Sequence, residues 1–204
     1  MELQNEIARD LLNIKAVQIK TDSFFTWTSG IQSPIYCDNR LTMSYPAIRQ
    51  KITKAFIQKL QDLNIKPDII AGCATAGIPH AAWLANELNI PMIYVRSKPK
   101  GHGKGNQIEG KVEKGQKIVV IEDLISTGGS SLETANVLRS KGLDVQAILA
   151  IFTYGLEVSD KRFKEENLPA FTITSFDKLL DVLVTDDEIT EVDRKKLLKW
   201  RDQL

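Results

Sequence analysis

Apolar positions along the chain alternate between helical and extended spacing. Residues 2–14 and 46–63 carry an apolar residue at every third or fourth position, which predicts amphipathic helices. Short apolar runs rich in β-branched residues predict buried strands. The predicted strands cover residues 17–20, 68–74, 91–96, 118–121, 145–152 and 171–174, and the further helices cover 79–88, 132–141, 156–167, 176–183 and 188–200.

This order of elements predicts the fold class. Strands that alternate with helices favour an α/β fold with a mainly parallel central sheet flanked by helices. The 204 residues suit a single domain, residues 1–204, with a small N-terminal appendage over about residues 1–45 and a core over about 46–204. Within the appendage, residues 24–40 contain two β-prone pieces around a turn at Ser29-Gly30, and Pro34 limits the second piece to an edge position.

The most informative stretch is 117–131. A strand over Ile118–Ile121 leads to Glu122 and Asp123 at its expected carboxyl end, then to a hydroxyl- and glycine-rich loop, and a helix is predicted from Leu132 until Gly142 stops it. Glycines and a helix N-terminus bind anions, whereas paired carboxylates suit sugar hydroxyls or a Mg²⁺ ion reached through water. A phosphate beside a diol indicates a ribose 5-phosphate. The alternative is an ordinary βα turn with a Ser N-cap.

A second polar stretch runs from Ser97 to Gly110. It carries Lys98, Lys100, His102 and Lys104 among four glycines and has almost no aliphatic residues, so we expect it to be mobile without ligand. Its glycines are not a dinucleotide-binding fingerprint, because no helix is predicted to follow them, and no Gly-Lys-Ser/Thr closes the spacing of a Walker A loop. Its cations suit closure over a pyrophosphate, and the alternative is a solvated basic loop.

Composition narrows the setting. The chain is 43% hydrophobic and 26% charged with a net charge of +1, so we expect no nucleic-acid or membrane partner. No apolar run approaches the ~20 residues of a spanning helix, and the acidic, polar N-terminus is unlike a signal peptide. Cys37 and Cys73 could pair, but we expect two free thiols in a reducing compartment. We therefore predict a cytoplasmic protein.

Two motifs resemble a known family. The acid pair and Ser-Thr-Gly-Gly loop of 117–131 resemble the signature of the type I phosphoribosyltransferases, which bind 5-phosphoribosyl-1-pyrophosphate (PRPP). Ser29-Gly30, Ser33 to Tyr36, Asp38 and Arg40 resemble the N-terminal hood of the orotate phosphoribosyltransferases. The resemblance implies the type I fold, and transfer of the phosphoribosyl group from PRPP to orotate, which gives orotidine 5′-monophosphate and pyrophosphate in pyrimidine biosynthesis.

The resemblance also implies roles for individual residues. Catalytic roles fall on Lys100, His102 and Asp123. PRPP binding falls on Arg96, Lys100, His102, Glu122, Asp123, Leu124, Ile125, Ser126, Thr127, Gly128, Gly129 and Ser130. Orotate contacts fall on Ser126, Tyr36 and Tyr154. The Ala74–Gly77 turn would border the pyrophosphate, and His80 is expected to be structural.

The family's cofactor and assembly follow in the same way. Mg²⁺ would be held through PRPP, with Glu122 and Asp123 nearby and no direct protein ligand. A homodimer is implied, in which the basic loop reaches the neighbouring subunit's site.

Four positions depart from the family pattern. Many relatives have lysine where this chain has Thr28, Ala76 and Ser97, and arginine near Tyr154. Two alternatives remain at this stage: a phosphoribosyltransferase for another base, such as a purine, or a PRPP-sensing regulator that binds nucleic acid and has lost catalysis. The hood argues against the first, and the net charge with the Arg96/Lys100/His102 set argues against the second.

Overall fold

A six-stranded sheet forms the centre of the protein. The computed structural model describes residues 2–26, 32–98 and 106–204. The strand order is β10-β9-β8-β5-β6-β7, and every pairing is parallel except that of β7 with β6. The six strands are β5 (Ile69–Cys73), β6 (Met92–Val95), β7 (Ile108–Glu109), β8 (Lys117–Ile125), β9 (Asp144–Thr153) and β10 (Ala170–Ser175). The predicted α/β fold with a mainly parallel sheet is confirmed.

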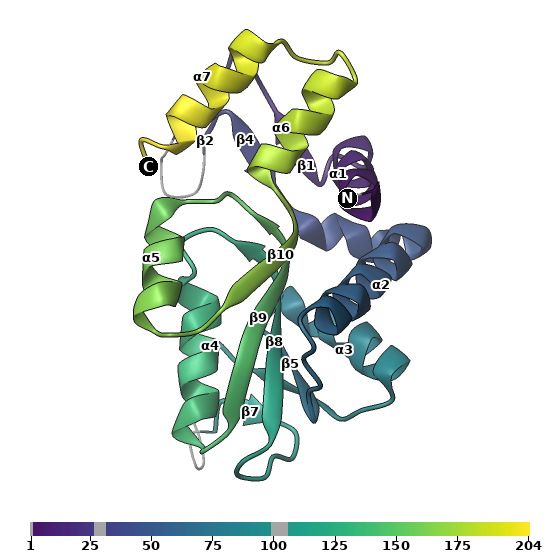
Figure 1. Cartoon of the computed structure of the whole chain (residues 1–204), viewed down its shortest axis with the longest axis vertical. Coiled ribbons are helices and arrows are strands. Elements are labelled where there is room, and N and C mark those ends of the chain that lie inside the picture. The colour runs from purple at the N-terminus through teal and green to yellow at the C-terminus, as the bar shows by residue number, and fades with distance from the viewer. Residues whose placement is uncertain (1, 27–31, 99–105) are drawn as a thin grey trace.

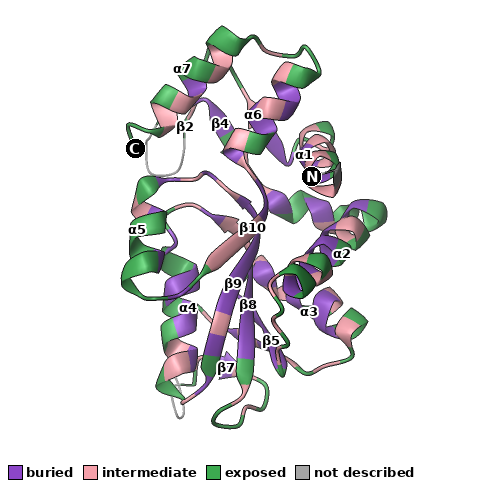
Figure 2. Ribbon diagram, viewed as in Figure 1, coloured by how far each residue is buried: buried purple, intermediate pink, exposed green. Residues whose placement is uncertain are grey.

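Helices cover both faces of this sheet. Figure 1 shows α2 (Pro46–Asp62) and α3 (Gly77–Leu88) on one side and α4 (Gly129–Ser140) and α5 (Glu157–Glu165) on the other. Successive residues of β8 point to opposite faces, so Val119 and Val120 fall in different hydrophobic clusters. A strand buried on both faces reads as a continuous apolar run, which is why the sequence identified it. Figure 2 shows β5, β8 and β9 as buried along most of their length.

The sheet reverses its direction of growth between β5 and β8. From β5 the chain runs through α3 to β6 on one side, and from β8 it runs through α4 to β9 on the other. In parallel sheets, ligands bind outside the carboxyl ends of the strands at such a switch point. The topology therefore predicts a ligand site at the carboxyl ends of β5 and β8.

The N-terminal segment forms two small antiparallel pairs beside one helix. Its elements are α1 (Glu2–Asn13), β1 (Val17–Ile19), β2 (Phe25–Thr26), β3 (Gln32–Ser33), β4 (Ile35–Cys37) and the 3₁₀ helix η1 (Asn39–Ser44). Pro34 divides the second β-prone piece, so that β3 pairs with β2 whereas β4 pairs with β1. A proline has no N–H to continue a ladder, which explains the division. The predicted turn at Ser29-Gly30 lies outside the described residues.

Helix α6 (Phe176–Thr185) packs onto this N-terminal segment, and α7 (Glu191–Arg201) packs onto α6. Ser175 caps α6, and α7 begins with a capping box at Thr190. Side chains of α1 and α6 share one hydrophobic cluster, and Figure 1 shows α1, α6 and α7 in the same half of the molecule. Periodicity predicted these helices but not which segment they would cover. Among the described residues, no helix is long and apolar enough to cross a membrane.

Candidate active site

The predicted acid pair lies at the switch point. β8 spans Lys117–Ile125, so the prediction that the strand ends at Ile121 is wrong, and the two acids lie within it. The ladder with β5 nevertheless stops at Ile121, whereas pairing with β9 continues to Ile125. The last four residues of β8 thus have a strand neighbour on one side only. The sequence could not show this, because the strand's length is set by β9.

The two carboxylates have different environments. The side chain of Glu122 is buried, its Oε1 accepts from the backbone N–H of Asp123 at 2.9 Å, and its Oε2 accepts from Ser130 Oγ at 3.1 Å. Burial and the adjacent Asp123 raise the pKa of Glu122 to about 8. Burial also raises the pKa of Asp123, although Asp123 is only half-buried. Asp123 is therefore the more accessible of the pair for a ligand.

The glycine loop leads into α4 as an uncapped helix start. Gly128, in the left-handed conformation with φ +76°, precedes Gly129, the first residue of α4. The helix thus begins three residues before the predicted Leu132. No side chain caps this end of α4 in the described part of the chain, so the Ser N-cap alternative is wrong. The free N–H groups of a first helical turn bind anions.

Helix α5 packs against this glycine loop. Arg162 Nη1 donates to the carbonyl of Thr127 at 3.1 Å, and the Phe163 ring lies 2.9 Å from where a Cβ on Gly128 would stand. Sequence analysis missed both residues, because nothing in the spacing of α5 distinguishes them from surface and core positions.

The Ala74–Gly77 turn lies directly against the acid pair. A Cβ on Gly77 would stand 2.2 Å from the carbonyl oxygen of Ile121 and 3.2 Å from Glu122 Cα, so only glycine permits this approach. The Ala74–Thr75 peptide is cis, and Ala74 N–H donates to the Val95 carbonyl at 3.0 Å. The turn therefore connects the end of β6 with the acid pair.

The basic loop begins and ends at this same edge of the sheet. Arg96 N–H donates to the Gln107 carbonyl at 2.9 Å, and the Arg96 guanidinium lies 3.5 Å from Glu109. The two ends of the loop are thus held together beside the Ala74–Gly77 turn. The predicted catalytic residues Lys100 and His102, and the expected mobility of this loop, lie outside the described residues.

Two tyrosines predicted to contact orotate come from β4 and from the turn after β9. Tyr36 is 39% exposed, with its ring 5.8 Å from that of Phe25. Tyr154 is only 5% exposed and packs edge-on against Phe152. Burial, followed by the charges of Cys37 and Asp123, raises the pKa of Tyr154. Tyr154 therefore lies close to both the acid pair and β4, but its side chain offers little free surface.

Three further predictions concern core residues. His80 is buried against Trp83, and burial lowers its pKa to about 4, so it is neutral at pH 7. Cys37 and Cys73 are free thiols, as predicted. Cys73 accepts a hydrogen bond from Thr134 at 3.2 Å beneath the glycine loop.

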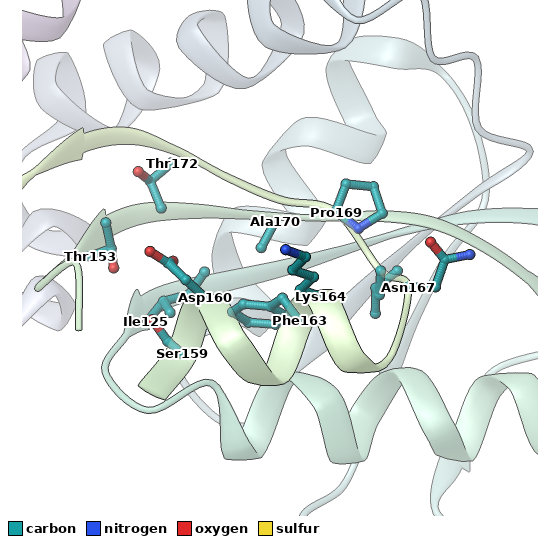
Figure 3. Close-up of a pocket in the computed structure, with 11 residues that line it drawn as sticks. Ile125, Thr153, Ser159, Asp160, Phe163, Lys164, Asn167, Pro169, Ala170 and Thr172 are labelled. Carbon is teal, nitrogen blue, oxygen red and sulfur yellow. The ribbon is translucent and has the colours of Figure 1, made fainter. Parts of the chain in front are cut away.

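A separate cavity of about 570 Å³ lies between α5 and β10 (Figure 3). Phe163 and Lys164 line it from α5, and Pro169 and Ala170 line it from the opposite wall. Of the predicted site residues only Ile125 borders it. This cavity is therefore beside the glycine loop rather than at the acid pair.

The described residues do not gather a protein-only metal site. No group of three or more His, Cys, Asp or Glu side chains among them could hold an ion. Glu122 and Asp123 alone supply too few oxygens for the shell that Mg²⁺ requires, so an ion at this site would take most of its ligands from a substrate and water.

Comparisons with known proteins agree with this geometry. The phosphoribosyl transferase domain family matches residues 43–174, which leaves out most of the N-terminal segment and helices α6 and α7. The chain is 55% identical over 202 residues to the orotate phosphoribosyltransferase of Oceanobacillus iheyensis, a match that covers 99% of this chain and 100% of the relative.

Two solved structures share the fold at 30% identity. Orotate phosphoribosyltransferase from Aeropyrum pernix has a TM-score of 0.77, with 87% of this chain and 97% of that chain covered. UMP synthase from Leishmania donovani has a TM-score of 0.81; the match covers 98% of this chain, which spans 42% of that longer chain. The chain belongs to the phosphoribosyltransferase family and, within it, to the orotate phosphoribosyltransferases.

Proposed function

We propose that the protein transfers the 5-phosphoribosyl group from PRPP to orotate, giving orotidine 5′-monophosphate and pyrophosphate. The observation that carries this proposal is the meeting of the acid pair, the uncapped glycine loop and the Ala74–Gly77 turn at one switch point. Each offers a surface for a different part of PRPP, and the relatives are named for this activity.

Residues of different charge would bind different parts of PRPP. The N–H groups of the loop and the first turn of α4 would bind the 5-phosphate. Asp123, the more accessible acid, would accept from the ribose hydroxyls, while Glu122 holds Ser130 and the Asp123 backbone in place. As the bond to pyrophosphate breaks, the ribose gains positive charge that the Asp123 carboxylate would favour, and Arg96 with the predicted Lys100 and His102 would stabilise the leaving group.

The proposal includes Mg²⁺, a homodimer and a cytoplasmic location. When bound with PRPP, Mg²⁺ supplies positive charge that stabilises the departing pyrophosphate. The basic loop would close over the site of the partner subunit and exclude water, which competes with orotate as nucleophile. Free thiols at Cys37 and Cys73 suit a reducing compartment.

A base panel tests the reaction. Loss of orotate absorbance in the presence of PRPP and Mg²⁺, with no turnover of uracil, hypoxanthine or adenine, is the expected result. Turnover of a purine would indicate a different phosphoribosyltransferase. PRPP binding without consumption of any base would indicate a regulator.

A further inference from the structure

Asn39 is a polar residue that neither the motifs nor the proposed mechanism uses. It is the first residue of η1, and its side chain is completely buried. Its Nδ2 donates to the backbone carbonyl of Asp123 at 2.8 Å, across 84 residues of sequence. An N-terminal side chain thus contacts the peptide that carries the more accessible acid.

The position of this contact explains why the chain needs it. β8 continues past the end of β5, so on that side the backbone at residues 122–125 has no strand beside it. Gly77 fills the place next to Ile121, and Asn39 supplies the donor for Asp123. Without Asn39 the part-buried Asp123 carbonyl would lose this donor, and neighbouring β9 would hold this part of β8 from one side only. Asn39 supplies the contact on the other side.

The rest of the amide is not satisfied in the same way. Asn39 Oδ1 has no hydrogen-bond partner within the described residues, although the atom is buried. The backbone carbonyl of Asn39, in contrast, accepts from Thr42 Oγ1 at 2.6 Å. Thr42 Oγ1 also lies 3.4 Å from His80 Nε2. An amide retained at this cost, where a small apolar residue would be simpler to bury, indicates that its donor matters.

We propose that Asn39 is a positioning residue, which fixes the Asp123 peptide and thereby aims the Asp123 carboxylate at the ribose. Because Asn39 follows β4 by only two residues, the same bond ties the N-terminal segment that carries Tyr36 to the ribose site. This inference rests on the proposed function and adds to it a residue that touches neither substrate.

Two substitutions test the bond, and one serves as control. Asn39→Ala removes the donor, and Asn39→Asp keeps the shape but replaces the donor with an acceptor facing a carbonyl. Thr42→Val is the matched control, because it lies in the same buried cluster and leaves the bond from Asn39 to Asp123 intact. Measured for each would be kcat and KM for PRPP and for orotate, PRPP affinity by calorimetry, and Tm.

Both Asn39 variants are expected to lose about 10- to 100-fold in kcat, with a smaller change in KM for orotate, as a misplaced group would cause. Thr42→Val is expected to lose similar Tm but to stay within about threefold in kcat. Activity losses that follow Tm equally in all three variants would overturn the proposal, as would an Asn39→Asp enzyme with wild-type kcat. Should Asn39→Ala not fold, Asn39→Ser makes the same comparison with a smaller cavity.

The result also separates this inference from the proposed function. If the wild-type protein binds PRPP but consumes no orotate, the proposed function fails. PRPP affinity would then decide the role of Asn39: a loss in both Asn39 variants but not in Thr42→Val supports it, and equal affinities contradict it.

Discussion

At the scale of single residues, the site depends on groups held in unfavourable surroundings. Glu122 is a carboxyl group buried beside a second one, and Gly128 adopts a backbone conformation that other residues avoid. Both features are costs that a protein without a function at this point would have no reason to retain. Each makes a prediction about stability.

The first prediction concerns pH. Because the folded-state pKa of Glu122 is raised to about 8, protonated Glu122 stabilises the fold at low pH, and this contribution is lost as pH rises toward and through 8. Glu122→Gln remains neutral, so its Tm should gain on the wild-type Tm between about pH 5 and about pH 8 and stay level above that, with ~1 kcal/mol equal to about 2–4 °C. Thermal scans across this range check it. The exposed Glu133→Gln variant on α4 is the control, and a constant difference between wild type and Glu122→Gln would contradict the assignment.

The second prediction concerns the loop glycine. Gly128→Ala combines a positive φ with a Cβ only 2.9 Å from the Phe163 ring, whereas Gly115→Ala has a positive φ of +88° and no atom within 4 Å. Both variants should lose about 1–2 kcal/mol from the left-handed conformation, and Gly128→Ala should lose about 1–3 kcal/mol more through overpacking. Denaturant titrations measure the two free energies of unfolding, and equal losses would mean that α5 does not support the loop.

At the scale of elements, the C-terminal helix braces the site from outside the matched family domain. Arg201 on α7 has a side chain only 13% exposed, which pairs with Asp177 at 2.8 Å and donates to the Tyr154 carbonyl at 3.4 Å. Arg194 on the same helix pairs instead with Asp181 on α6 at 2.8 Å. The two arginines therefore separate bracing of the turn from pairing between α6 and α7.

Arg201→Ala should raise the KM for orotate about threefold or more, because the turn after β9 that carries Tyr154 loses its support. Arg194→Ala should lower stability by about 1 kcal/mol or less and leave that KM unchanged. Steady-state kinetics with orotate varied, alongside Tm, checks both variants. Equal KM values would show that α7 contributes stability alone.

The element scale also shows how far the sequence leads. Amphipathic helices were predicted from their period, buried strands from apolar runs rich in β-branched residues, and the acid pair and glycine loop from residue type. The end of β8 was missed because its length depends on β9, and the start of α4 because Gly128 turns the chain before the apolar spacing begins. Asn39 was missed because its partner lies 84 residues away, and no local pattern records such a contact.

At the scale of the whole molecule, the proposed homodimer would combine residues from two copies of the chain in each working site. Lys100→Ala, which is expected to cut turnover strongly, removes a loop cation, and Asp123→Asn removes a ribose contact. If the loop serves the partner's site, mixing the two inactive variants after subunit exchange should restore about a quarter of wild-type activity, since each mixed dimer has one intact site. Absence of recovery in mixed dimers, verified by mass, would place loop and acids of a site in one subunit.

The proposed place of phosphoribosyl transfer is Asp123, near the end of β8. Its most direct test is the rate of orotidine 5′-monophosphate formation by Asp123→Asn, with the exposed Asp160→Asn on α5 as control. We expect a loss of about 10²-fold or more for Asp123→Asn, as when one electrostatic contact to the transition state is removed, and near wild-type turnover for Asp160→Asn. A folded Asp123→Asn enzyme with wild-type turnover would contradict it.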